Sequence, residues 1–283
     1  MYKTFYGLTR NPFEVSPDPY FFCPTLGHME ALANLAYCVL RRRGFVVVTG
    51  EVGTGKTLLV RCLLDFLTQR KVAFAYLYNP MISVSEFLTN VTNELRLLPS
   101  PNRTKSDALS CLNNYLMERS RQDLTTALVV DEAQLLSWEL LEEIRLLTNL
   151  ETTKHKLLQI VLAGQPEFEQ KLDSQPLRQL KQRISLRCSL KPLEMKELQG
   201  YIYRRLELAG GNSHASAIFP NETINVIQGF SRGIPRLVNT LCENSLLLGF
   251  AHKQHQITPD IVQEVAADLH LDSVAEVSFG RYD

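Results

Sequence analysis

The chain has 283 residues, of which 45% are hydrophobic, and its 30 basic residues balance its 30 acidic ones. This composition suffices for one large core or two smaller ones, and the zero net charge provides no overall field for holding nucleic acid or an anionic membrane. No stretch approaches the roughly 20 apolar residues of a membrane-spanning helix, and the N-terminus lacks the basic and apolar segments of a secretory signal.

The first 27 residues are predicted to form a proline-rich arm. Prolines at positions 12, 17, 19 and 24 restrict the backbone and favour a stiff, non-helical segment. The aromatic side chains of Phe13 and Phe21 are expected to pack against a core.

Residues 28–190 alternate between strand-like and helical patterns, which predicts an α/β domain with a parallel sheet sandwiched by helices. The strand-like runs are 45–49, 73–78, 127–131, 157–164 and 184–190. The third and fourth are nearly continuous apolar runs, as in strands that are covered on both faces. The predicted helices are 29–43, 56–69, 83–98, 106–121 and 137–151.

After Pro192 the pattern becomes helical throughout. The spacing of apolar residues predicts four helices, over 193–209, 221–230, 235–252 and 259–270. We therefore predict a domain boundary near residue 190 and an all-α four-helix domain over 191–271. The tail over 272–283 is expected to be poorly ordered.

The segment "GEVGTGKT" carries the strongest motif. It fits Gly-x-x-x-x-Gly-Lys-Thr, follows a predicted strand and opens a predicted helix, which is the context of a P-loop. Lys56, solvated while the site is empty, is predicted to reach the β- and γ-phosphates of ATP, and the Thr57 hydroxyl to bind Mg²⁺. The alternative is a chance glycine-rich turn. The predicted nucleotide-binding residues are Gly50, Glu51, Val52, Gly53, Thr54, Gly55, Lys56, Thr57 and Leu58.

The segment "ALVVDEAQ" supplies two carboxylates at the end of an apolar strand. Asp131 is predicted to bind Mg²⁺ through water, and Glu132 to act as the general base that polarises the attacking water. The alternative is that these two residues only cap the next helix.

The order of these features resembles the AAA+ ATPases over residues of about 28–270. The resemblance implies hydrolysis of Mg-ATP to ADP and phosphate, and a nucleotide-dependent homo-oligomer such as a hexameric ring. It also assigns the γ-phosphate-sensing position to Gln165 in "LAGQPE", where the family more often has Asn, Ser or Thr. Alternatively, Gln165 caps the helix that begins at Pro166.

Two further arginine roles follow from the same resemblance. In this family the helical lid closes over the nucleotide, and Arg236 in "GIPR" occupies the position of the lid arginine that touches the γ-phosphate. Arg183 best matches the arginine that acts on the neighbouring subunit, and Arg178 is the second choice. Either role has a plain alternative, a surface arginine in a turn or a solvated charge.

The N-terminal pattern Tyr-Gly-Leu, Asn-Pro-Phe and Pro-Asp-Pro narrows the resemblance to the general secretion pathway protein A (ExeA/GspA) group, and most to its short MshM-type members of mannose-sensitive haemagglutinin (MSHA) pilus biogenesis. In that setting the arm would close over the adenine. The long members continue into a membrane span and a peptidoglycan-binding domain, whereas this sequence ends at Asp283. We therefore expect a protein that acts in pilus or type II secretion assembly through a protein partner, peripheral to the inner membrane. Six cysteines without a Cys-x-x-Cys pair also predict reduced thiols in the cytoplasm and no structural zinc.

Two other functions remain open. One is a DNA-handling AAA+ protein, such as a transposition helper or loader, although no helix-turn-helix follows residue 271 and only "RRRG" is compactly basic. The other is a scaffold that is gated by nucleotide and hydrolyses ATP slowly.

Overall fold

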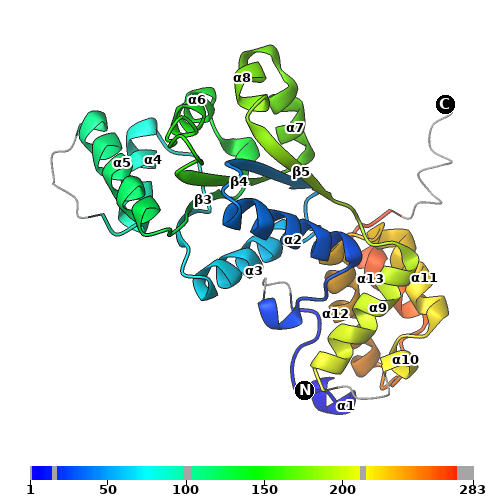
Figure 1. Cartoon of the computed structure of the whole chain (residues 1–283). Coiled ribbons are helices and arrows are strands. Elements are labelled where there is room, and N and C mark those ends of the chain that lie inside the picture. The colour runs from blue at the N-terminus through cyan, green and yellow to red at the C-terminus, as the bar shows by residue number, and fades with distance from the viewer. Residues whose placement is uncertain (1, 15–17, 98–103, 211–214, 273–283) are drawn as a thin grey trace, which may run out of the picture. The chain divides into compact units, whose positions relative to one another are not determined.

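The computed structural model describes residues 2–14, 18–97, 104–210 and 215–272 (Figure 1). The chain divides into two compact units. The sheet unit comprises Leu26–Glu51 and Lys56–Leu190, and the helical unit comprises Met1–Thr25, Val52–Gly55 and Lys191–Asp283. Apart from Asp272, the tail predicted to be poorly ordered lies outside the described residues.

The sheet unit is built on five parallel strands in the order β2-β3-β4-β1-β5, so the predicted parallel sheet is confirmed. The strands are β1 Phe45–Gly50, β2 Ala73–Leu77, β3 Thr126–Val130, β4 Leu158–Gly164 and β5 Ile184–Leu190. Every residue of β1, β3 and β4 is buried, because helices cover both faces of the sheet centre. Figure 1 shows α2 and α3 on one face and α6 and α7 on the other.

The helices of the sheet unit begin at clear capping signals. Ser83 and Glu86 form a reciprocal capping box at α4, and Thr104 and Asp107 form another at α5. Two predicted helices are longer than the observed ones, because α4 ends where Arg96 turns left-handed, and the end of the 137–151 stretch joins a short antiparallel bridge. The helices are α2 Leu26–Leu40, α3 Lys56–Gln69, α4 Val84–Glu94, α5 Lys105–Arg121, α6 Trp138–Leu147, α7 Pro166–Asp173 and α8 Arg178–Lys181, with 3₁₀ turns η2 Ala133–Leu135 and η3 Gln175–Leu177.

After residue 190, the described part of the helical unit contains the four predicted helices and one short additional helix. They are α9 Met195–Leu208, α10 Ala215–Ile218, α11 Asn221–Ser231, α12 Pro235–Ala251 and α13 Pro259–Asp268. The turn between α11 and α12 requires Gly233, which has a φ of 75° and on which a Cβ would stand 2.1 Å from the carbonyl oxygen of Leu193. Pro235 then opens α12, where its missing N–H costs nothing.

The N-terminal arm belongs to the helical unit. Phe13 and Phe21 are buried in the same core as Leu198 and Ile202 of α9. The buried guanidinium of Arg205 donates to the carbonyl oxygen of Pro12 and, at 2.7 Å, to the hydroxyl of Tyr201.

The arm is not wholly extended, contrary to the prediction. Tyr2–Phe5 forms one helical turn, α1, and Pro19–Phe21 forms a 3₁₀ turn, η1. Helical structure is possible at the start because the first proline comes only at position 12.

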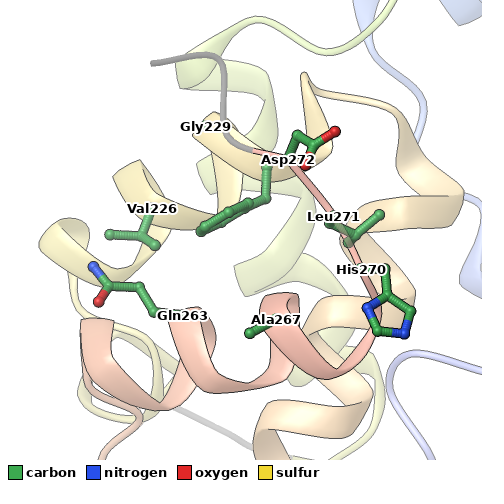
Figure 2. Close-up of a pocket in the computed structure, with 8 residues that line it drawn as sticks. Val226, Gly229, Gln263, Ala267, His270, Leu271 and Asp272 are labelled. Atoms are coloured by element: carbon green, nitrogen blue, oxygen red, sulfur yellow. The ribbon is translucent and has the colours of Figure 1, made fainter. Parts of the chain in front are cut away.

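A pocket of about 630 Å³ lies between α11 and α13 (Figure 2). Phe230, Ala267 and His270 are among the residues that line it, and none of the predicted nucleotide-site residues does so. Among the described residues, no helix combines the length and the apolarity that crossing a bilayer requires.

Candidate nucleotide-binding site

The predicted P-loop connects β1 to α3. Gly50 ends the strand, Lys56 begins the helix, and Thr57 and Leu58 lie in its first turn. Gly53 and Gly55 have φ angles of 85° and 98°, a left-handed backbone that glycine adopts without strain. This backbone makes the sharp turn that a phosphate-binding loop needs.

Lys56 is buried, not solvated as the sequence analysis predicted. Its side chain is only 6% exposed, and its Nζ donates to the carbonyl oxygens of Gly50 at 2.7 Å and Glu51 at 3.0 Å. The ammonium group turns back on its own loop because two carbonyl oxygens there can replace its lost hydration. These two bonds tie the start of α3 to the end of β1.

Thr57 and Asp131 place a hydroxyl and a carboxylate beside this loop. Asp131 follows β3 and is buried, and its Oδ2 accepts a hydrogen bond of 2.8 Å from the Thr57 hydroxyl. Burial raises the pKa of Asp131, although the bonds from Thr57 and from the Glu132 N–H oppose this effect. Hydroxyl and carboxylate oxygens are the hard ligands that Mg²⁺ prefers, so these two residues fit a magnesium site.

Glu132 is held by two glutamine side chains. Its Oε2 accepts hydrogen bonds from Nε2 of Gln134 at 2.5 Å and from Nε2 of Gln165 at 3.3 Å. The Gln165 N–H in turn donates to Oε1 of Gln134 at 3.0 Å. Glu132 also has a left-handed backbone, with φ 52° and ψ 41°, which is strained for a residue other than glycine.

The capping alternatives fit this geometry poorly. Glu132 precedes η2 and Gln165 precedes α7, but neither side chain makes a capping hydrogen bond. Gln134 was missed by the sequence analysis, although it stands in the quoted segment "ALVVDEAQ" as the fourth residue after Val130. Its place in the sequence, shortly after Asp131 and Glu132, is the signal that could have identified it.

Arg236 is exposed in the first turn of α12. Its backbone N–H donates to the carbonyl oxygen of Gly53 at 3.2 Å, and both residues belong to the helical unit. A Cβ on Gly53 would stand 2.8 Å from Cβ of Arg236 and 2.9 Å from Cγ2 of Ile234. Gly53 therefore serves a second purpose, because only glycine permits this close approach.

Arg183 lies at the amino end of β5, whereas Lys56 and Asp131 follow the carboxyl ends of β1 and β3. It precedes β5, whose first residue is paired with Phe45 at the start of β1, whereas the P-loop follows the end of β1. The six residues of β1 span about 17 Å, which is the distance along the strand between its first residue and the start of the P-loop. Arg183 donates to the Thr148 hydroxyl at 2.9 Å, and Arg178 is exposed at the start of α8. Within one chain, Arg183 is thus placed away from the P-loop.

Comparisons with known proteins find one matching domain family and one similar curated protein. Residues 40–172 match the AAA domain family. General secretion pathway protein A of Aeromonas hydrophila is 39% identical over 257 residues, which cover 91% of this chain and 46% of that protein. The chain therefore spans about half the length of this relative.

Solved structures share the fold at low identity. Cdc6p from Pyrobaculum aerophilum matches with a TM-score of 0.68 and 17% identity, over 97% of this chain and 75% of that chain. The ORC2 protein of Aeropyrum pernix matches with a TM-score of 0.67 and 15% identity, over 98% of this chain and 76% of that chain. The Holliday junction branch migration motor RuvB of Thermotoga maritima matches with a TM-score of 0.55 and 17% identity, over 88% of this chain and 70% of that chain. At these identities the likeness concerns the fold alone.

Proposed function

Because this chain is an AAA+ protein of the general secretion pathway protein A type, we propose that it hydrolyses Mg-ATP to drive assembly of a type II secretion machine or of an MSHA-like type IV pilus. The ATPase proposal rests on one observation. Four residues follow the carboxyl ends of β1 and β3 and lie close together there: Lys56, Thr57, Asp131 and Glu132. The relative's name supports a role in a secretion pathway, and the N-terminal sequence pattern suggests the pilus setting.

The chemistry follows from what each side chain can do. Lys56 would exchange the carbonyl oxygens of its loop for phosphate oxygens, and Thr57 and Asp131 would hold Mg²⁺, which would supply positive charge to offset that of the phosphates. Glu132 accepts the proton of the attacking water. Gln134 and Gln165 fix the Glu132 carboxylate, so that they act as positioning residues.

The assembly role has its own test. Deleting the gene should abolish pilus or type II secretion assembly, measured by surface pilin or secreted enzyme, while a plasmid copy restores it. If assembly stays normal and transposition is impaired, the chain is a DNA-handling ATPase. A protein that acts in assembly with very slow turnover would be the nucleotide-gated scaffold.

Arg236 should couple the γ-phosphate to the helical unit. We expect Arg236→Ala to bind ADP almost as tightly as the wild-type protein but to discriminate poorly between ADP and ATP, because a guanidinium makes charge-assisted bonds that alanine cannot. Hydrogen exchange over α9 and α12 should be slower with a non-hydrolysable ATP analogue than with ADP in the wild type only.

The matched control for Arg236 is Arg204→Ala, which removes an exposed arginine from α9 of the same unit. This variant should switch normally. Equal protection of the wild type in ADP and in the ATP analogue would contradict a lid that responds to the γ-phosphate.

Arg183 should act on the site of a neighbouring copy, since it lies far from the P-loop edge of its own sheet. Lys56→Ala and Arg183→Ala should each be inactive, and an equimolar mixture should regain part of the ATPase activity, because each copy supplies what the other lacks. Arg178→Ala tested in the same way separates the two candidates. Full activity of a protein that light scattering shows to be monomeric with ATP would rule out this proposal.

A further inference from the structure

Helix α2 presents an apolar stripe to solvent. Leu26, Met29, Tyr37 and Leu40 are 75%, 53%, 51% and 37% exposed. At 100° per residue these four side chains fall within an arc of about 80°, along a helix about 22 Å long. The outward face of a helix in a water-soluble domain is usually polar, and the one charged residue of α2 is Glu30.

A basic pocket of about 440 Å³ lies at the C-terminal end of this stripe. The turns that follow α2, α3 and α5 line this pocket, and each of these turns leads into the amino end of a strand. Four of the lining residues are cationic and one is acidic: Arg41, Arg42, Arg70, Lys71 and Asp123. The pocket is therefore strongly positive, whereas the whole chain has no net charge.

One of these cations builds the pocket and the other three face outward. Arg42 donates to Asp123 at 2.8 Å and contacts His155 at 3.0 Å. Burial and the charge of Arg42 lower the pKa of His155, so that this ring adds no charge at neutral pH. Arg41, Arg70 and Lys71 are exposed, and the guanidinium groups of Arg41 and Arg70 lie over the rings of Tyr37 and Phe66, 6.0 and 5.2 Å from the ring centroids.

We propose that the α2 stripe and the basic pocket together form a docking surface for an anionic lipid bilayer. The apolar side chains enter the boundary between headgroups and acyl chains, and Arg41, Arg70 and Lys71 bind lipid phosphates. Nucleic acid would match the cations but would leave the apolar stripe in water. The surface would account for the peripheral location at the inner membrane that the sequence analysis predicts, and it rests on the proposed assembly function but not on ATP hydrolysis.

Co-sedimentation with vesicles tests this surface. The wild-type protein should sediment with vesicles of equimolar phosphatidylcholine and phosphatidylglycerol and much less with phosphatidylcholine alone. Arg70→Gln with Lys71→Gln should weaken this binding about 25-fold at low salt, or about fivefold for each charge removed. The matched control is Arg96→Gln with Arg121→Gln, two exposed arginines of the same unit that do not line the pocket, and it should bind normally.

The stripe is tested separately by Met29→Gln with Tyr37→Gln, which should also weaken vesicle binding. The control is Met195→Gln with Leu247→Gln, which changes two exposed apolar residues outside the stripe and should bind vesicles normally. ATPase turnover of all these variants should equal that of the wild type. Absence of wild-type binding, or equal binding to both kinds of vesicle, would overturn the proposal. So would a stripe variant that binds vesicles normally but loses self-association in light scattering, since the stripe would then be an interface between copies.

Discussion

Glu132→Gln should hydrolyse ATP about 10²- to 10⁴-fold more slowly than the wild-type protein while it still binds ATP and Mg²⁺. The amide cannot accept a proton from water, whereas the Mg²⁺ ligands Thr57 and Asp131 are untouched. Steady-state phosphate release measures the loss, and binding of a fluorescent ATP analogue measures the affinity. If turnover survived and Mg²⁺ affinity collapsed, the roles of Asp131 and Glu132 would have to be exchanged.

A companion variant separates the base from the residue that positions it. Gln134→Leu removes the 2.5 Å bond to Glu132 but leaves the carboxylate in place. Its turnover should fall less than that of Glu132→Gln, because the base itself remains and only one of its two glutamine donors is lost. Glu139→Gln, which changes an exposed glutamate of α6, is the matched control and should be fully active.

Lys56→Ala should abolish nucleotide binding. The loop over residues 50–57 loses its one basic side chain, so isothermal titration with ATP should detect no binding at concentrations that saturate the wild type. Because Lys56 also bonds the carbonyls of Gly50 and Glu51, the variant should lose about 1–3 kcal/mol of unfolding free energy.

The control for Lys56 is Lys71→Ala, an exposed lysine of the same unit outside the P-loop. It should bind ATP normally. Circular dichroism must show that Lys56→Ala is folded, and a folded Lys56→Ala that binds ATP with wild-type affinity would refute the P-loop assignment.

The sheet and the P-loop could be predicted from the sequence because their signals are local. Buried parallel strands appear as continuous apolar runs, and α3 begins and ends at the predicted residues 56 and 69, directly after the glycine-rich loop. The motif residues Lys56 and Thr57 are adjacent in the chain, so their spacing alone indicates their chemistry.

The contacts around Glu132 could not be predicted in the same way. Gln165 meets Glu132 and Gln134 because β3 and β4 are neighbours, with Val130 paired to Leu162. Apolar periodicity identifies strands but does not state which strands pair. Burial of Lys56 was missed for a similar reason, since the direction of a long side chain depends on the folded loop.

The sequence also does not indicate which core the N-terminal arm packs against. The ring of Phe13 stacks edge-on against Phe219, 5.9 Å away between centroids, although the two residues are far apart in the chain. A buried aromatic residue indicates that some core exists, but not which one.

Membership of the arm in the helical unit fixes an order of events during synthesis. Residues 26–190 contain the whole sheet unit and leave the ribosome before the helices of the helical unit, of which α13 is complete only 78 residues later (268 − 190). At about 5–20 residues per second, this delay is roughly 4 to 16 seconds. The arm is made before both units, so Phe13 and Phe21 must wait in water or on a chaperone until α9 and α12 emerge. Helices that are made after the sheet unit thus bury a segment that is made before it.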